Sequence, residues 1–311
     1  MTTLLFTHKA FLDHDTGPGH PERPDRLRAI EKALSHDFFA GLKREEAPLS
    51  DTEPLRLVHD ERYVAALEER RQTDRTIHLD PDTVMSPGSW EAALRAVGAA
   101  LAATDAVMEG RAANAFCAIR PPGHHAEAAR ALGFCLFNNV AVAAFHARVK
   151  HGAERVAVVD FDVHHGNGTQ AMFWRDKNAL YISTHQMPLF PGTGSLSETG
   201  LYDNIVNAPL RSGDNGEVFQ DAFRSRVLPA LDRFAPDIIF ISAGFDAHQD
   251  DPLASLELTE ADFGWATQVL LDKAYKYAGG RVVSLLEGGY GLTGLARSVA
   301  VHVSELMRAG A

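Results

Sequence analysis

Cysteine is nearly absent from this 311-residue sequence, which contains two, Cys117 and Cys135. Both are flanked by apolar residues, where a free thiol behaves as a small buried hydrophobe, so a disulfide-stabilised fold is not expected. No apolar run approaches the roughly 20 residues that a membrane-spanning helix requires, which excludes a membrane protein. Residues 1–14 also lack the basic start and apolar stretch of a secretory leader, so we expect a cytoplasmic protein.

Basic residues are outnumbered, with 30 Lys and Arg against 41 Asp and Glu, a net charge of −11. This balance argues against a nucleic-acid surface and mildly favours cationic substrates through long-range attraction. Internal repeats, low-complexity tracts and linker-like segments are absent too, so residues 1–311 are predicted to form a single domain. Whether the chain forms a homo-oligomer is left open by the sequence.

Short apolar runs alternate with longer stretches of helical spacing. The apolar runs are residues 4–6, 115–119, 156–159, 180–182, 238–241 and 282–286. The helical stretches are residues 90–108, 140–149, 217–234, 260–277 and 295–307. Continuously apolar strands are typical of a sheet buried on both faces, and the alternation predicts an α/β fold with a central parallel sheet flanked by helices on both faces.

Several of the predicted strands end in polar, glycine-rich or proline-rich sequence. These ends are residues 120–125, 160–168, 243–246 and 287–290. Ligands of open parallel sheets bind beyond the carboxyl ends of the strands. We therefore expect four loops to converge on one cleft.

Asp160, Asp162 and His164 follow the strand at 156–159 with a spacing of two residues. In extended backbone, alternate side chains point to the same side, so a carboxylate and an imidazole can face one point. A catalytic zinc site takes three protein ligands and leaves one position open, and Asp246, at the end of another strand, is the candidate for the third ligand.

Each of these residues alone is more simply a polar residue of a loop, since Asp, His and Gly are common at strand ends. Their combination with two His-His pairs, His124-His125 and His164-His165, favours a functional site, because adjacent histidines on two separate loops rarely arise for packing.

Five ordered motifs resemble the signature set of histone deacetylases and their bacterial relatives, the class II type and the acetylpolyamine amidohydrolases included. They are Arg120-Pro-Pro-Gly-His-His125, Asp160-Phe-Asp-Val-His-His-Gly-Asn-Gly-Thr-Gln170, Phe190-Pro-Gly-Thr-Gly194, Ala243-Gly-Phe-Asp246 and Leu286-Glu-Gly-Gly-Tyr290. Residues 19–26, Gly-His-Pro-Glu-Arg-Pro-Asp-Arg, extend the similarity to the start of the chain. The resemblance implies the arginase/deacetylase fold, one catalytic domain and hydrolysis of N-acyl amides.

By matching position, Asp162, His164 and Asp246 would bind one Zn²⁺, which polarises the amide carbonyl and activates water. His125 would act as general base and then as acid, and His124 as its electrostatic partner or proton donor. Iron could occupy the same ligands.

Three further residues complete this catalytic set. Asp160 would orient His124, and Tyr290 would place its hydroxyl against the oxyanion. Asn167 stands where class I members carry an aspartate, so the pKa of His125 should be lower here than in class I.

The resemblance also assigns a substrate channel and a structural K⁺. Gly133, Phe134 and Phe190 match the channel, and Leu253 falls where polyamine-selective relatives carry an acidic residue. The K⁺ would be held by backbone carbonyls and the Asp162 side chain, in a shell that includes Asp160, His164 and Ser183. Weaker matches link Arg26 to the glycines beside the catalytic tyrosine, and Asp82 and Thr83 to binding of the substrate backbone.

Several interpretations stay open. The favoured partner is an acetylated lysine peptide or protein, with an acetylated polyamine or other small amide as the alternative. Loss of a metal ligand, a histidine or the tyrosine would have favoured a non-catalytic acyl-lysine binding protein, but all are retained. A two-metal arginase-like enzyme would need more Asp and His ligands.

The other histidines are expected to be surface or hydrogen-bonded core residues, among them His20, His59, His78, His146 and His185. Residues 68–71 are expected to form a solvated helical face.

Overall fold

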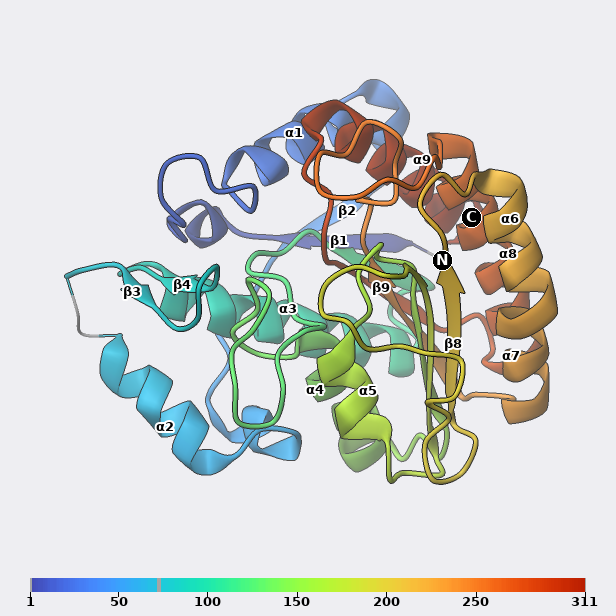
Figure 1. The fold of residues 1–311 in the computed structure, drawn as a ribbon, viewed down its shortest axis with the longest axis horizontal. Helices are drawn as coiled ribbons and strands as arrows, with labels where there is room; N and C mark the ends of the chain where they lie inside the picture. The colour runs from blue at the N-terminus through green and yellow to red at the C-terminus, as the bar shows by residue number, and fades with distance from the viewer. Residues whose placement is uncertain (1, 72–73, 311) are drawn as a thin grey trace.

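The computed structural model describes residues 2–71 and 74–310, in which eight parallel strands form one central sheet (Figure 1). The strands are β1 (Thr3–Thr7), β2 (Lys43–Glu46), β5 (Asn114–Cys117), β6 (Val156–Asp160), β7 (Ala179–Gln186), β8 (Ile205–Leu210), β9 (Ile238–Ala243) and β10 (Val282–Leu286). Their order across the sheet is β2-β1-β5-β10-β9-β6-β7-β8. The parallel sheet predicted from the sequence is confirmed.

Burial explains why the inner strands are rich in apolar residues. Every residue of β5, β6, β7, β9 and β10 is buried, because helices cover both faces of the sheet. A separate pair, β3 (Ile77–His78) and β4 (Val84–Met85), is antiparallel and lies outside this sheet.

Helices cover the sheet in two layers. They are α1 (Asp25–Leu34), α2 (Glu61–Arg70), α3 (Ser89–Met108), α4 (Asn139–His151), α5 (Asn167–Phe173), α6 (Gly216–Ala222), α7 (Leu228–Phe234), α8 (Glu260–Tyr277) and α9 (Leu292–Gly310), with short 3₁₀ turns η1 (Lys9–Leu12), η2 (Asp37–Phe39) and η3 (Glu53–Leu57). In one layer α3 packs on α4 and α4 on α5, and in the other α1 packs on α9, α9 on α8, and α8 on α7 (Figure 1). Among the described helices, none has the length and hydropathy needed to cross a bilayer.

One predicted helix is interrupted. Residues 217–234 were expected to form a single helix, but a π-helical turn, η4 (Phe223–Val227), separates α6 from α7. Pro229 supplies a reason, because it has no N–H to bond the carbonyl of Ser225 four residues earlier.

Four adjacent strands of the sheet, β5, β10, β9 and β6, bring their carboxyl ends together. The loops that follow them contain the polar motifs found in the sequence, so the sheet order alone gathers these motifs at one edge.

Both cysteines have free thiols and are buried, as expected.

Candidate active site

Asp162, His164 and Asp246 form a buried cluster at this edge of the sheet, with ligand atoms within 4.8 Å of one another. Nδ1 of His164 lies 3.1 Å from Oδ1 of Asp162 and 3.1 Å from Oδ2 of Asp246. Ligand atoms around a tetrahedral zinc ion are about 3.4 Å apart when metal–ligand distances are about 2.1 Å. The donor set and its spacing therefore fit a single Zn²⁺ or a similar divalent ion.

Backbone amides hold the two carboxylates in place. Gly288 N donates to Oδ2 of Asp162 over 2.7 Å, and Val163 N donates to Oδ1 of Asp246 over 2.8 Å. Glycine is required at 244 and 288, because a Cβ at either position would collide with the Asp162 or Asp246 carboxylate. The metal ligands are thus positioned by three separate loops.

The electrostatics of the cluster favour a bound cation. Burial and the nearby Asp162 carboxylate together raise the pKa of Asp246 to about 7, although His164 opposes the shift. Although burial lowers the pKa of His164, Asp162 and Asp246 together raise it to about 10. Two buried carboxylates around one imidazole therefore attract positive charge, which a divalent ion supplies.

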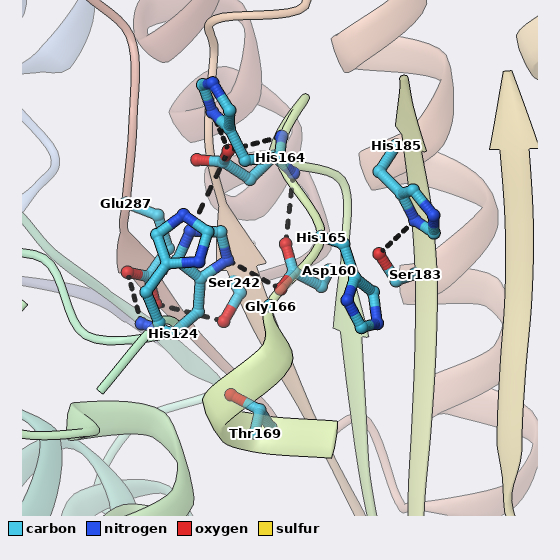
Figure 2. Close-up of polar contacts among 12 residues, drawn as sticks. His124, Asp160, His164, His165, Gly166, Thr169, Ser183, His185, Ser242 and Glu287 are labelled. Carbon is cyan, nitrogen blue, oxygen red and sulfur yellow. Dashed lines mark hydrogen bonds and ion pairs between the residues drawn. The ribbon is translucent and has the colours of Figure 1, made fainter. Parts of the chain in front are cut away.

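The two adjacent histidines lie beside this cluster, with ring centroids 4.0 Å apart. Nδ1 of His124 is 2.9 Å from Oδ2 of Asp160, and Nδ1 of His125 is 2.9 Å from Oδ1 of Asn167. The structure thus brings His125 to Asn167 and His124 to Asp160, and Figure 2 shows the second of these contacts.

The two rings differ in their preferred charge. Burial lowers the pKa of His124, but Asp160 and Asp162 more than compensate and raise it to about 10. Burial and the neighbouring His124 and His164 hold the pKa of His125 well below its usual range, and the bond to Asn167 opposes that shift only in part.

A tyrosine that the sequence did not single out supports Asp160. The Tyr181 hydroxyl donates to Oδ2 of Asp160 over 2.9 Å and accepts from Gly166 N over 3.0 Å. Tyr181 lies in the middle of β7, where an isolated aromatic residue is ordinarily read as core packing. This contact can be recognised only in the folded structure, because no sequence motif marks Tyr181.

Glu287 is a buried carboxylate that sequence reasoning also missed, although it lies inside the motif Leu286-Glu-Gly-Gly-Tyr290. Its Oε2 accepts from Gly123 N over 2.7 Å and from His124 N over 3.2 Å, and its Oε1 accepts from the Ser242 hydroxyl over 3.1 Å (Figure 2). Burial raises its pKa to about 7, a shift that the nearby His124 opposes. Glu287 therefore ties the loop of the His pair to the ends of β9 and β10.

Tyr290 follows in the same loop, against the Arg26 guanidinium, whose carbon lies 4.9 Å from the ring centroid. Arg26 donates through Nε to the Gly289 carbonyl over 2.6 Å and also contacts the Glu287 carbonyl. The structure thus places Arg26 where the sequence match implied. Burial raises the pKa of Tyr290 well above its usual range, so its hydroxyl keeps its proton.

Phe134 and Phe190 reach the site from different loops. The Phe190 ring is 5.0 Å from the His125 ring, and the Phe134 ring is 5.8 Å from the Tyr290 ring, between centroids. Gly133 has a φ of +55°, and a Cβ there would lie 3.0 Å from Phe190 and closer still to His125. The half-buried Leu253 is linked to the site through Asp251, to which its backbone N–H donates over 3.0 Å.

Asp82 and Thr83, which match the family only weakly, lie close to Phe134. The Thr83 hydroxyl accepts from Phe134 N over 3.0 Å. Nε2 of His20 lies 3.0 Å from the Asp82 carbonyl, and its ring centroid is 4.7 Å from that of Phe134.

The second residue of the other His-His pair points elsewhere. His165 contacts the Thr193 hydroxyl at 2.7 Å and Oε1 of Gln170 at 3.0 Å, and its ring lies beside His185. Ser183 contacts Nδ1 of His185 at 2.9 Å and is the register partner of Asp160 between β6 and β7. His185 is thus a hydrogen-bonded core residue, as expected.

A parallel α/β sheet thus presents, at one edge, a buried cluster of two carboxylates and one imidazole that could hold a metal ion beside paired histidines. The Histone deacetylase domain model matches residues 20–306. The "Uncharacterized protein slr0245" of Synechocystis sp. is 42% identical over 312 residues, covering 99% of this chain and 100% of its own. The "Histone deacetylase-like amidohydrolase" of Pseudomonas aeruginosa is 41% identical over 277 residues, covering 88% of this chain and 73% of its own.

The crystal structure of the HDA15 HD domain superimposes with a TM-score of 0.94 at 36% identity, covering 99% of this chain and 89% of that one. The chain therefore belongs to the histone deacetylase family. The family resemblance drawn from the motifs is confirmed, and family membership supports hydrolase activity.

Proposed function

We propose that this protein is a zinc-dependent deacetylase that hydrolyses the amide bond of N-acetyl-lysine side chains. The observation that carries the proposal is the buried Asp162, His164 and Asp246 cluster lying beside the His124-His125 pair. These three residues would hold Zn²⁺, which when bound polarises the amide carbonyl and lowers the pKa of the attacking water.

His125 is the proposed proton carrier, and its hydrogen bonds define its tautomer. Asn167 donates through Nδ2 to the His125 carbonyl over 3.3 Å and to Glu127 over 2.8 Å, so its Oδ1 faces the ring. Nδ1 of His125 must then carry the hydrogen, which leaves Nε2 with a lone pair. Nε2 can accept the proton of the attacking water and deliver it to the leaving amine.

His124 and Tyr290 would stabilise the charge that develops. His124 is held against Asp160 and Glu287, so its positive form is favoured and lies next to the reacting groups. The Tyr290 hydroxyl, which stays protonated, would donate to the oxyanion.

A structural K⁺ beside the zinc would draw on backbone carbonyls and the Asp162 side chain, in a shell that includes Asp160, His164 and Ser183. The fit rests on buried charge, because Asp160 lies next to Asp162 and its pKa is raised first by burial and also by that carboxylate. A monovalent cation would join His124 in balancing these two buried carboxylates.

Acetyl-lysine is preferred over acetylpolyamine because the proposed channel lacks an acidic side chain at Leu253, while Phe134 and Phe190 supply apolar walls that suit an aliphatic stem. The net charge of −11 attracts both kinds of cationic substrate and does not separate them.

The test is turnover of an acetyl-lysine peptide, a longer acyl-lysine peptide and acetylpolyamines side by side, with Tyr290→Phe as the variant. We expect the acetyl-lysine peptide to be preferred, and Tyr290→Phe to lower kcat about 10²- to 10³-fold at unchanged zinc content, as loss of an oxyanion donor does elsewhere. Full activity after exhaustive chelation would refute the metal mechanism. Exclusive turnover of polyamines would overturn the lysine preference, and full activity of Tyr290→Phe the oxyanion role.

A further inference from the structure

A second cluster of metal-ligating side chains lies between α3 and α4. Oδ1 of Asp105, on α3, is 2.8 Å from Nε2 of His146 and 2.6 Å from Nε2 of His151, both on α4. The three side chains are between 12% and 19% exposed, so they are held by packing yet can be reached from solvent. From the sequence, His146 was expected to be no more than a surface or hydrogen-bonded core residue.

This cluster lies at the edge of the sheet opposite the candidate active site. α3 ends at Met108, shortly before β5 begins, and α4 ends at His151, shortly before β6 begins. The active-site loops leave the other ends of the same two strands. The two groups of ligands are therefore independent of each other.

Both helices end at the cluster, and helix C-termini favour cations. Asp105 lies near the C-terminal end of α3, which has no basic residue in its last turn, so its carboxylate and the helix dipole both attract positive charge. α4 ends at His151, followed by Gly152 in the left-handed conformation. The C-terminal ends of α3 and α4 thus lie close to one carboxylate and two imidazoles.

We propose that Asp105, His146 and His151 bind a divalent transition-metal ion of the Zn²⁺ type, at a second site weaker than the one at Asp162. Their ligand atoms lie within 4.8 Å of one another, and two imidazoles with one carboxylate are a typical set for such an ion. Each ring nitrogen needs to withdraw from Oδ1 by less than about 1 Å to reach tetrahedral spacing. The ion replaces the two hydrogen bonds, with the ring hydrogens carried on Nδ1, and solvent supplies the fourth ligand.

Lys150 limits the affinity of this site. Its Nζ lies 2.7 Å from Oδ2 of Asp105 and is half exposed, so an ammonium competes with the ion for the same carboxylate. Because Lys150 contacts Oδ2, the other carboxylate oxygen of Asp105, Oδ1, can still bind the metal ion. Lys150→Gln should therefore bind Zn²⁺ about three- to tenfold more tightly, because a nearby like charge is removed in a largely solvated setting.

The experiment is titration of chelator-treated full-length protein with Zn²⁺, followed by calorimetry and by metal analysis after dialysis. The wild type is expected to take up two equivalents. The double variant His146→Gln, His151→Gln should lose the weaker one, and its melting temperature should stop rising once Zn²⁺ is added beyond the first equivalent. His78→Gln, at an exposed histidine on β3, is the matched control and should retain both equivalents.

A variant with Asp162→Asn and Asp246→Asn separates this proposal from the proposed function, since it should lose the tight equivalent and keep the weaker one. Melting in the presence of chelator checks that the histidine double variant is folded, and Lys150→Gln tests the site without removing a ligand. Uptake of one equivalent by the wild type would overturn the proposal. The proposal would also be overturned if the double variant still bound the weaker equivalent of Zn²⁺ and Lys150→Gln left its affinity unchanged. The three side chains would then only join α3 to α4 through hydrogen bonds, without a metal ion.

Discussion

The backbone of Tyr290 is fixed by a carboxylate outside the motifs. Oδ2 of the buried Asp251 accepts from Tyr290 N over 2.6 Å and from Gly291 N over 2.9 Å, while its Oδ1 accepts from Leu253 N over 3.0 Å. Asp251→Ala removes all three bonds, so we expect kcat on the acetyl-lysine peptide to fall by about tenfold or more, the equivalent of about 1–3 kcal/mol. Steady-state kinetics measure this loss.

Asp251→Asn is the graded companion of that variant. Its amide keeps one oxygen for Tyr290 and Gly291 but turns an NH₂ group toward Leu253 N, so its kcat should lie between the wild type and Asp251→Ala. The zinc content of both variants should equal that of the wild type. An Asp251→Ala enzyme with normal kcat, or with lost zinc, would show that Asp251 does not act by positioning Tyr290.

Apart from Glu287, the candidate site residues inside motifs could be proposed from the sequence, and residues that support them across the fold could not. The spacing of Asp160, Asp162 and His164 after a buried strand already indicated that their side chains point to the same side. The contacts of Tyr181 and Asp251 join segments far apart in the chain, so neither residue carries a local pattern of its own. Their roles follow from the sheet order, which the sequence did not give.

At the scale of elements, α3 depends on a glycine in its interior. Gly98 packs against the loop that follows β2, where an added Cβ would collide with the Pro48 carbonyl. Gly98→Ala should therefore destabilise the protein by about 1–3 kcal/mol, although alanine is the better helix former by about 1 kcal/mol. Urea unfolding measures the difference.

Gly41→Ala provides the control, because its added methyl would meet only the flexible end of Met307, at 3.4 Å. This variant should stay within about 0.5 kcal/mol of the wild type. A Gly98→Ala protein that is as stable as Gly41→Ala would mean that the loop at Pro48 yields at little cost.

The missed strands are the two edges of the sheet. β2 reads Lys-Arg-Glu-Glu and has no apolar run, and β8 contains Asn207 and Pro209. Such residues are tolerated at an edge, where one side of the strand has no partner, and charge or proline there discourages pairing between molecules. The inner strands could be predicted because a strand that is buried on both faces consists mainly of apolar residues. An edge strand is less buried and need not have an apolar sequence, so it gives no such pattern.

At the scale of the whole molecule, buried charge joins the N-terminal segment to the ends of two strands, β5 and β10. The Glu22 carboxylate is fully buried and pairs with Arg26 and Arg120. Arg120 follows β5 and also donates to the Phe11 carbonyl over 2.7 Å, while Arg26 reaches the loop after β10. Although burial raises the pKa of Glu22, Arg120 and His14 hold it well below its usual range, so the network stays charged.

Buried neutral histidines should make the whole fold sensitive to acid. His59 Nε2 accepts from Asn138 N over 2.9 Å, which requires an unprotonated nitrogen, and burial lowers the pKa of His59 to about 4. The unfolded chain takes up this proton near pH 6.5, so between pH 6.5 and pH 4 it binds more protons than the folded protein. Stability is therefore lost as the pH falls through that window, by roughly 3 kcal/mol from this residue.

His59→Gln isolates this contribution, because its amide can accept from Asn138 N and donate to the Glu127 carbonyl, which His59 also contacts. Urea unfolding of both proteins at pH 7, 6, 5 and 4.5 gives the two pH dependences. Because the glutamine does not titrate, the variant should gain about 2 kcal/mol relative to the wild type between pH 7 and pH 4.5. Parallel curves would mean that His59 is protonated equally in both states, and the acid sensitivity would then have to come from other groups such as the buried His302, whose pKa burial lowers to about 3.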